Sequence, residues 1–367
     1  MYGSEQICFS TRKPRDSWLS VGPDGERPGP NKAVLEITRA CNMRCLHCAS
    51  AAGTVRPNEL STERMLTLID ELHELGVEDM VFSGGEPLVR KDWPVLAARV
   101  RGHGMSLGMV SNGTFALRHM HHIREYLTAY SMSLDGMEET HNHIRCSPTA
   151  FSDVFAAFDE LAEHDVYRFA VTSISKLNLH QLEDMYRLLV EHDVVGWQVQ
   201  LVFASGRMRE REELICSPED LYRITEFLAR VRDESLLELH TGDNIGYYTA
   251  LEDTVRGCTW RGCQAGLSLI SIEADGNVKG CLCQEPELRE GKKFVEGNVN
   301  HRPIADIWRD DSLFAYNRQF DLGQARGFCA SCRHLKLCRC GCTAFAHYVS
   351  GTKYNNPYCL YRLMATT

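Results

Sequence analysis

Short apolar runs alternate with helical apolar spacings along most of this chain. The run AVLEIT (33–38) is typical of a buried strand. After Ser61 and Thr62, apolar residues recur every three or four positions until Gly76, as on one face of an amphipathic helix. The order of strand and then helix repeats five more times. We predict the later strands over 79–83, 106–112, 129–134, 167–175 and 197–203, and the later helices over 92–104, 117–127, 150–164, 179–192 and 217–234.

Six strand–helix units in series predict a parallel sheet, because each helix carries the chain back to the start of the next strand. Right-handed crossovers would curl the sheet into a partial, TIM-like (β/α)6 barrel over 33–240. We therefore expect an α/β fold. Residues 1–32, rich in Pro, Gly and charge, would form an N-terminal arm. Beyond the barrel we predict a hairpin over 266–281 with its turn at Asp275, and one helix over 305–318.

The overall composition is that of a globular protein in water. The 367 residues are 44% hydrophobic and 24% charged, which excludes fibrous and disordered chains. A net charge of −9 gives no basis for bulk attraction to nucleic acid or to an anionic membrane. No apolar run approaches the ~18 residues of a membrane span, and the N-terminus lacks the apolar core of a secretory signal. We expect a soluble, cytoplasmic protein.

Cysteine is the unusual component of the chain. Of the 16 cysteines, 13 lie in two dense regions, and only Cys8, Cys146 and Cys216 lie outside them. This content is too low for the disulfide scaffold of a small secreted domain. Without a secretory signal, clustered cysteines indicate metal binding or catalysis. Residues 241–367 hold the second region and have too little apolar periodicity for a large core, so we expect metal bonds to hold them together as a small, Cys-rich domain.

The first region is the motif CNMRCLHC, which directly follows the first strand. It places Cys41, Cys45 and Cys48 in one short loop. Three thiolates are one fewer than a closed [4Fe–4S] cluster binds, so one iron would remain open to a substrate or a cofactor. A zinc site, or three unrelated thiols, is the alternative that this spacing alone leaves open.

Together with three later motifs, this loop resembles the radical SAM superfamily. The resemblance implies that the open iron binds the amino and carboxylate groups of S-adenosylmethionine (SAM), which is then cleaved to a 5′-deoxyadenosyl radical. It also implies a SAM pocket at the carboxyl ends of the strands, the usual active-site face of a β/α barrel. The pocket residues would be His47 beside the adenine, Gly84, Gly85, Glu86 and Pro87 at the methionyl amino group, Asn112 nearby, and Ser133 and Asp135 at the ribose.

The second cysteine region resembles the SPASM extension of radical SAM peptide maturases. Its spacing is Cys-x12-Gly-x4-Cys, then Cys-x2-Cys-x5-Cys-x3-Cys and a last, distal cysteine. The resemblance implies two auxiliary [4Fe–4S] clusters, and so three such clusters in the chain. Their ligands would be Cys258, Cys263, Cys281 and Cys342 for the first auxiliary cluster, and Cys329, Cys332, Cys338 and Cys359 for the second. Zinc ribbons are the alternative, since CxxC motifs with further cysteines also bind zinc.

Two more cysteines of this region lie outside both predicted ligand sets. Cys283 and Cys340 compete with Cys258 as ligands, and they are also our candidates for returning a hydrogen atom to a substrate radical. Arg207 and two neighbouring arginines follow the sixth strand, at the mouth of the predicted barrel. We consider them as candidates for holding a substrate carboxylate.

The leading hypothesis is a radical SAM oxidoreductase or maturase that oxidises, crosslinks or decarboxylates a ribosomally made peptide. The segment HCASAAGTVRPNELST is locally similar to the mycofactocin maturase family. Because the expected arm is too short to be a peptide-recognition domain, such an enzyme would need a separate leader-peptide-binding protein. It would also need an electron donor of the flavodoxin or ferredoxin type.

Two other readings remain open. The same chemistry could act on a small molecule, by dehydrogenating or epimerising a sugar or aminoglycoside, or by modifying a tetrapyrrole side chain. A non-enzymatic zinc or iron–sulfur binding module is the third. Sulfatase maturation is not expected, because Leu282 stands after Cys281 where sulfatase-maturing relatives carry a carboxylate base.

Overall fold

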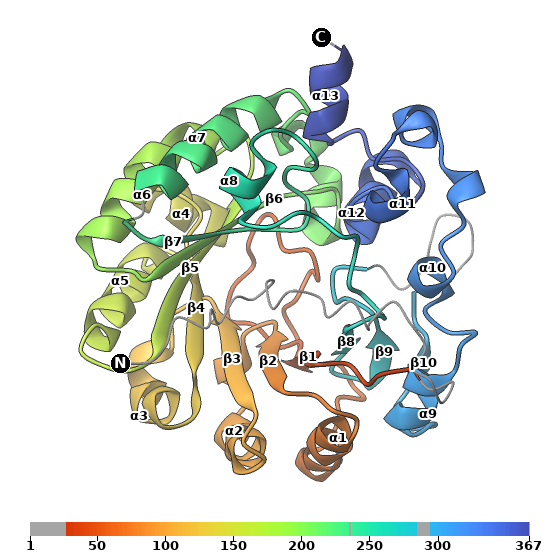
Figure 1. Cartoon of the computed structure of the whole chain (residues 1–367). Helices are drawn as coiled ribbons and strands as arrows, with labels where there is room; N and C mark the ends of the chain where they lie inside the picture. Colours follow the sequence, from red (N-terminus) through yellow and green to blue (C-terminus); the bar gives the residue numbers. More distant parts are fainter. Residues whose placement is uncertain (1–26, 235, 285–293, 367) are drawn as a thin grey trace.

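A single twisted sheet organises the chain (Figure 1). The computed structural model describes residues 27–234, 236–284 and 294–366. Within them the sheet has ten strands in the order β10-β9-β8-β1-β2-β3-β4-β5-β6-β7. The strands are β1 Lys32–Thr38, β2 Asp79–Gly84, β3 Ser106–Ser111, β4 Ala129–Ser133, β5 Tyr167–Ile174, β6 Gly196–Leu201, β7 Glu238–Thr241, β8 Leu269–Ile272, β9 Asn277–Lys279 and β10 Gly297–Asn298.

The first seven strands run parallel in chain order, which confirms the predicted parallel sheet. Helices lie along the outer side of these strands (Figure 1). They are α1 Thr62–Glu74, α2 Trp93–Gly102, α3 Ala116–Tyr126, α4 Glu138–Arg145, α5 Ala150–Leu161, α6 Leu182–Glu191 and α7 Asp220–Glu234. The six predicted strand–helix units are therefore present, and the partial, TIM-like α/β barrel is confirmed.

The main core lies between the sheet and its helices. Helix α1 follows the predicted pattern: Ser61 caps it by accepting a hydrogen bond from the Arg64 amide, and its apolar face is buried. Trp93 of α2 and Trp197 of β6 are fully buried, and the Trp197 indole donates to the Thr172 hydroxyl at 2.8 Å. Burying such large side chains with their polar atoms satisfied is strongly stabilising.

Two elements of the barrel were not predicted. Strand β7 has only four residues, ELHT, with two buried positions, so it is too short to give a clear apolar signal. Helix α4 has the polar sequence EETHNHIR, and it buries His141 and Arg145 in addition to Ile144. The acidic residues of its first turn are only a weak signal that a helix begins there. The helix is stabilised mainly by its packing against the rest of the barrel.

The predicted hairpin is confirmed as the antiparallel pair β8–β9, with a turn in which Gly276 adopts a φ of +90°. Strand β8 also pairs in parallel with β1, so the hairpin extends the barrel sheet instead of forming a separate one. Strand β1 is therefore central: Lys32 is opposite Asp79 of β2 on one side and Leu269 of β8 on the other.

The remaining helices belong to the Cys-rich part of the chain. They are α8 Glu252–Arg256, α9 Ile304–Arg309, α10 Ala315–Arg318, α11 Leu335–Cys338, α12 Thr343–Ser350 and α13 Leu360–Thr366. The prediction of one helix over 305–318 was wrong. The Asp310 carboxylate accepts hydrogen bonds from the Ser312 amide and hydroxyl, and this turn, with Phe314 at a φ of 53°, separates α9 from α10.

Most of the expected N-terminal arm, residues 1–26, lies outside the described residues. Among the described helices, none is long and apolar enough to cross a membrane.

Charged side chains join the hairpin to the barrel. The Arg56 guanidinium lies 2.6 Å from the Asp275 carboxylate, 3.5 Å from Glu273 and 3.7 Å from Glu36 of β1. Lys279 of β9 is also within 3.0 Å of Glu273. Both glutamates are buried, so their charges are tolerated only because these cations compensate them.

Replacing Arg56 with Met should therefore lower the free energy of unfolding by about 3 kcal/mol, because buried carboxylates would lose a counter-charge. Anaerobic urea unfolding measures this change. Arg187→Met is the control, since Arg187 is exposed and pairs only along its own helix with Glu183; it should cost less than about 1 kcal/mol. Equal losses in the two variants would contradict this role for Arg56.

Candidate functional site

The three cysteines of the first motif lie together beyond the carboxyl end of β1. Cys45 is buried with Met43 and Ala150, and Cys41 and Cys48 pack against this group. The thiols therefore share one small, largely apolar environment in the loop between β1 and α1. This is the arrangement that the CxxxCxxC spacing predicts.

Hydrogen-bond donors surround the sulfur atoms. The Met43 amide donates to Cys41 Sγ at 3.4 Å, and Asn112 Nδ2 lies 4.0 Å from the same sulfur. Arg145 Nη1 donates to Cys45 Sγ at 3.8 Å. Donors of this kind stabilise thiolate ligands of iron–sulfur clusters and help to set their reduction potentials.

Arg207 holds the cysteine loop from the opposite side. Its Nε donates to the Cys45 carbonyl at 2.7 Å, and its Nη1 donates to the Ala52 carbonyl at 3.0 Å. The preceding Gly206 has a φ of +50°, and a Cβ there would lie 2.2 Å from the Cys48 carbonyl oxygen. Sequence reasoning considered Arg207 for a substrate carboxylate, whereas the structure uses its guanidinium to fix the loop backbone.

The GGEP motif follows β2 and docks directly on the cysteine loop. A Cβ on Gly84 would lie 2.3 Å from the Thr38 carbonyl oxygen, and one on Gly85 would lie 2.2 Å from the Ala40 carbonyl oxygen. Only glycine permits this contact. Pro87 then begins a buried 3-10 turn, Pro87–Val89.

Glu86 is fully buried behind this contact. Its carboxylate accepts hydrogen bonds from the Ser111 hydroxyl at 2.8 Å, the Asn112 amide at 2.7 Å and the Leu88 amide at 3.2 Å. Burial raises the pKa of Glu86 to about 7, although these donors oppose the shift. Glu86 thus ties the end of β3 to the GGEP turn, and its predicted contact with the SAM amino group stays a prediction.

Asp135 is the centre of a buried polar network just after β4. One carboxylate oxygen lies 2.8 Å from His47 Nε2 and is also paired with the Arg145 guanidinium, and the other accepts the Ser173 amide at 2.8 Å. Burial opposes ionisation, but Arg145 and His47 outweigh it and hold the pKa of Asp135 well below its usual range. Ser133, the last residue of β4, is half-buried close by in the chain. The predicted ribose contacts of both residues stay predictions.

Sequence reasoning missed two members of this network, His141 and Arg145. Both lie on α4, four residues apart, and so on one face of the helix. The Asp135 amide donates to His141 Nδ1 at 2.9 Å, and burial lowers the pKa of this histidine to about 3, so the ring is neutral and can accept. The only available signal was a His and an Arg at helical spacing soon after SLDG.

Three of the four cysteines predicted for the first auxiliary set lie near one another. Cys281 raises the pKa of Cys263, and both of them raise the pKa of Cys342, so the three thiols interact electrostatically. Cys283 joins them, because its thiol is hydrogen-bonded to Cys281. Cys258 is half-buried on the segment before Cys263. The choice between Cys258 and Cys283 as fourth member stays open.

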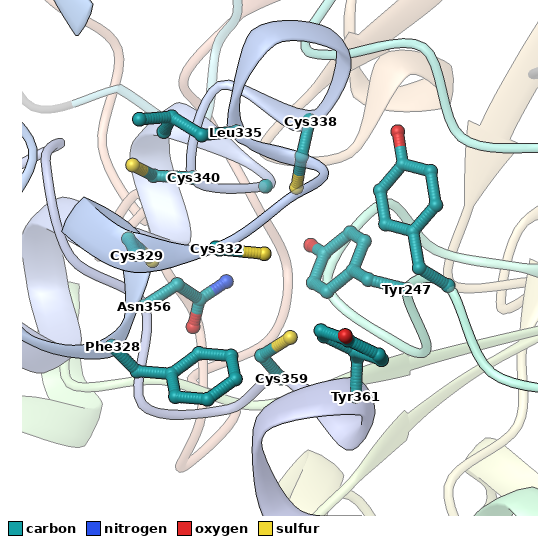
Figure 2. A pocket seen from close by; sticks show the side chains of 12 residues that line it. Tyr247, Phe328, Cys329, Cys332, Leu335, Cys338, Cys340, Asn356, Cys359 and Tyr361 are labelled. Carbon is teal, nitrogen blue, oxygen red and sulfur yellow. The ribbon is translucent and has the colours of Figure 1, made fainter. Parts of the chain in front are cut away.

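All four cysteines predicted for the second auxiliary set line one pocket. Figure 2 shows the sulfurs of Cys332, Cys338 and Cys359 directed toward the same space, with Cys329 to one side. Cys340 lines this pocket as well.

The two sets meet at a small apolar group. Tyr247 and Trp260 are buried there with Cys263 of the first set and Cys338 of the second. The Tyr247 hydroxyl accepts a hydrogen bond from the Cys342 amide at 3.1 Å.

The expectation that the Cys-rich region lacks a large core was wrong. Trp308, Phe314 and Phe345 are fully buried and belong to the main core, so packing as well as the cysteines holds the region together.

The chemistry of these side chains fits iron–sulfur clusters. Burial raises the pKa of Cys41 and of Cys263 to about 11, so these thiols would ionise at neutral pH only beside a compensating positive charge such as iron. Across the described part of the chain, no group of three or more Cys, His, Asp or Glu side chains is placed to hold a metal ion as the atoms stand. The evidence that these residues suit iron–sulfur clusters is therefore the grouping of the thiols and the hydrogen-bond donors around their sulfur atoms.

Comparisons with known proteins agree with this chemistry. Residues 35–189 match the family model of the radical SAM superfamily, and residues 263–341 match that of an iron–sulfur cluster-binding domain, SPASM. The chain is 30% identical to an AdoMet-dependent heme synthase of Methanosarcina barkeri, over 91% of this chain and 97% of that protein. It is 27% identical to the mycofactocin maturase MftC of Mycolicibacterium smegmatis, over 88% and 80% of the two chains.

Among solved structures, the fold matches SuiB of Streptococcus suis bound to S-adenosylmethionine. The TM-score is 0.71 at 16% identity, over 91% of this chain and 78% of that one. At this identity the match shows a shared fold, and it extends through both the barrel and the Cys-rich part.

Replacing Asp135 with Asn should lower the free energy of unfolding by about 3 kcal/mol, because Arg145 would stay buried without its counter-charge. The pKa of Asp135 lies below the ~3.9 of an unfolded aspartate, so its stabilisation is complete above that pH and is lost only as the pH falls below it. Anaerobic urea unfolding should therefore give the same loss at about pH 8 and at about pH 6. A loss that grows toward the lower pH would contradict this role for the ionised Asp135.

The matched control for this experiment is Asp70→Asn. Asp70 is about one-third exposed and pairs with Arg99 at the surface, so its loss should cost less than about 1 kcal/mol.

Proposed function

Because this chain belongs to the radical SAM superfamily and carries its SPASM iron–sulfur domain, we propose that it is an oxidoreductase that cleaves SAM and oxidises a substrate C–H bond. The observation that carries the proposal is the packing of three thiols in one loop that contacts Asn112 after β3 and Asp135 after β4. Residues at the carboxyl ends of parallel strands converge on one mouth, where a substrate can be enclosed.

We assign three cysteine sets to three [4Fe–4S] clusters. Cys41, Cys45 and Cys48 would hold the first, which lies in the barrel (33–240). The Cys-rich domain (241–367) would hold the two auxiliary clusters. When bound, these groups supply the one-electron chemistry: the first cluster reduces SAM to a 5′-deoxyadenosyl radical that takes a hydrogen atom from the substrate, and the auxiliary clusters accept or deliver an electron.

The residues around the first cysteine loop would bind and orient SAM. Gly84 and Gly85 bring backbone close to the loop, and Asn112, whose side chain lies at Cys41, would border the same pocket. His47, held by Asp135, would lie beside the adenine. A flavodoxin- or ferredoxin-type protein would supply the electron.

For the substrate, we propose a tetrapyrrole with carboxylate side chains. The support is the similarity to a heme synthase, which extends over nearly the full length of both chains. Oxidative loss of a carboxylate would suit an enzyme with auxiliary clusters: one hydrogen atom goes to the 5′-deoxyadenosyl radical, one electron goes to an acceptor, and carbon dioxide leaves.

A ribosomally made peptide is the second candidate substrate. It is favoured by the similarity to a mycofactocin maturase, which is nearly as high in identity and covers most of both chains. Removing one hydrogen atom and one electron from a peptide would give a crosslink, a desaturation or a decarboxylation. A separate leader-peptide-binding protein would be a partner only in this case.

Replacing Cys41, Cys45 and Cys48 together with Ala should remove about four of about twelve irons per reconstituted chain and abolish cleavage of SAM, since each cluster holds four irons. Iron analysis and chromatography of 5′-deoxyadenosine measure the two effects. Cys146→Ala is the control, because Cys146 is an exposed thiol at the end of α4 and should leave both values unchanged. Retained SAM cleavage in the triple variant would refute the proposed site.

The substrate is tested with the anaerobically reconstituted protein, SAM and a reductant. An iron tetrapyrrole bearing propionate groups, or a small peptide encoded beside the gene, is added and then weighed. We expect the tetrapyrrole to lose carbon dioxide and two hydrogen atoms. A change in the peptide alone would establish the second candidate, and 5′-deoxyadenosine formation with neither changed, also in heavy water, would exclude both.

A further inference from the structure

A fifth thiol lies in the pocket of the second auxiliary set. Cys329, Cys332, Cys338 and Cys359 supply the four ligands that a closed [4Fe–4S] cluster needs. Cys340 lines the same pocket and is only 3% exposed. The chain thus places one more buried thiol there than a cluster requires. Figure 2 shows Cys340 on the side of the pocket where Cys329 lies.

The backbone at Cys340 is unusual for a residue with a side chain. Arg339, Cys340 and Gly341 have φ values of 51°, 63° and 79°, so three consecutive residues are left-handed. This region strongly favours glycine, and cysteine has no polar oxygen to stabilise it as Asn or Asp does. The strain falls on the turn between Cys338 at the end of α11 and Cys342 at the start of α12. A strained residue that keeps a buried thiol indicates a use for that thiol.

Cys340 has a specific partner in the pocket. Its thiol is hydrogen-bonded to the sulfur of Cys329. Cys329 lies in the 3-10 turn Gly327–Ser331 and, like Cys340, is buried. The two sulfurs are therefore within one hydrogen bond of each other, on the same side of the pocket.

Building on the proposed auxiliary cluster, we propose that Cys329 and Cys340 share its fourth ligand position. One sulfur binds iron as the thiolate while the other donates its S–H hydrogen bond to that ligand. An exchange would break one Fe–S bond and form the other, with the proton crossing the hydrogen bond, so no electron is transferred and the net charge is unchanged. A hydrogen bond to a ligand sulfur is also one of the interactions that set a cluster's reduction potential.

The test measures iron and labile sulfide in the full-length reconstituted protein. Cys329→Ala and Cys340→Ala should each keep the wild-type content, because the remaining thiol completes the set. The double variant C329A/C340A should lose about four irons per chain, or convert to a three-iron cluster with its own electron paramagnetic resonance signal. The triple variant C332A/C338A/C359A is the positive control, because it removes three ligands at once and should lose about four irons per chain.

A second pair of variants separates the thiol from the backbone strain. Cys340→Gly removes the thiol and relieves the left-handed strain, whereas Cys340→Ala removes the thiol and keeps the strain. Equal cluster content in these two variants, combined with a loss in C329A/C340G, supports the shared position. If Cys329→Ala alone loses as much iron as the double variant, Cys340 is not a ligand and the proposal is overturned.

The same measurements distinguish this proposal from the proposed function. If the triple variant C332A/C338A/C359A keeps all its iron, no cluster sits in this pocket, and the assignment of the second auxiliary cluster fails together with the shared position. If the triple variant loses iron and Cys329→Ala loses as much iron as C329A/C340A, only the shared position fails.

Discussion

The buried ion pair of Asp135 and Arg145 fixes the geometry on which the candidate site depends. Asp135 follows β4, Arg145 ends α4, and the same guanidinium reaches Cys45 in the loop after β1. Buried charges are tolerated only when they are paired, so this arrangement is far more stable than one in which the loop moves away. His47, on the other side of the carboxylate, is oriented by the same pair. Sheet, helix and cysteine loop are thereby held in one arrangement.

Two further sets of contacts restrict the conformational freedom of the cysteine loop. Gly84 and Gly85 let the turn after β2 lie directly on the Thr38 and Ala40 carbonyls, just before the cysteine loop. Arg207 holds the Cys45 and Ala52 carbonyls from the other side. Each contact consumes backbone groups that would otherwise face water. A loop held in this way loses little further entropy when its side chains bind a ligand, which is the physical meaning of a preorganised site.

The sequence could predict the features whose signal is local. Strongly apolar strands, helix α1 with its Ser61 cap and the spacing of the cysteine motifs all depend on near neighbours in the chain. Helix α4, strand β7 and the break between α9 and α10 were missed because polar sequences acquire their structure there from tertiary contacts or from a single Asx turn. Arg145 was missed for the same reason: its partners are remote in sequence, and an arginine on a polar helix is normally solvated.

Strand β1 connects the two halves of the molecule more closely than a division into barrel and appended domain implies. The cysteine loop continues from its carboxyl end, and the hairpin that carries Cys281 pairs with its other edge through β8. Arg56 then adds buried ion pairs between the segment after the loop and the hairpin turn. Moving the hairpin would break the parallel pairing of β1 with β8 and would also expose the charges that Arg56 pairs. The Cys-rich part is therefore held in a fixed position relative to the first cysteine loop. Electron transfer requires fixed separations between redox centres. The shared strand and the apolar residues of the Cys-rich part that are buried in the main core both keep these separations fixed.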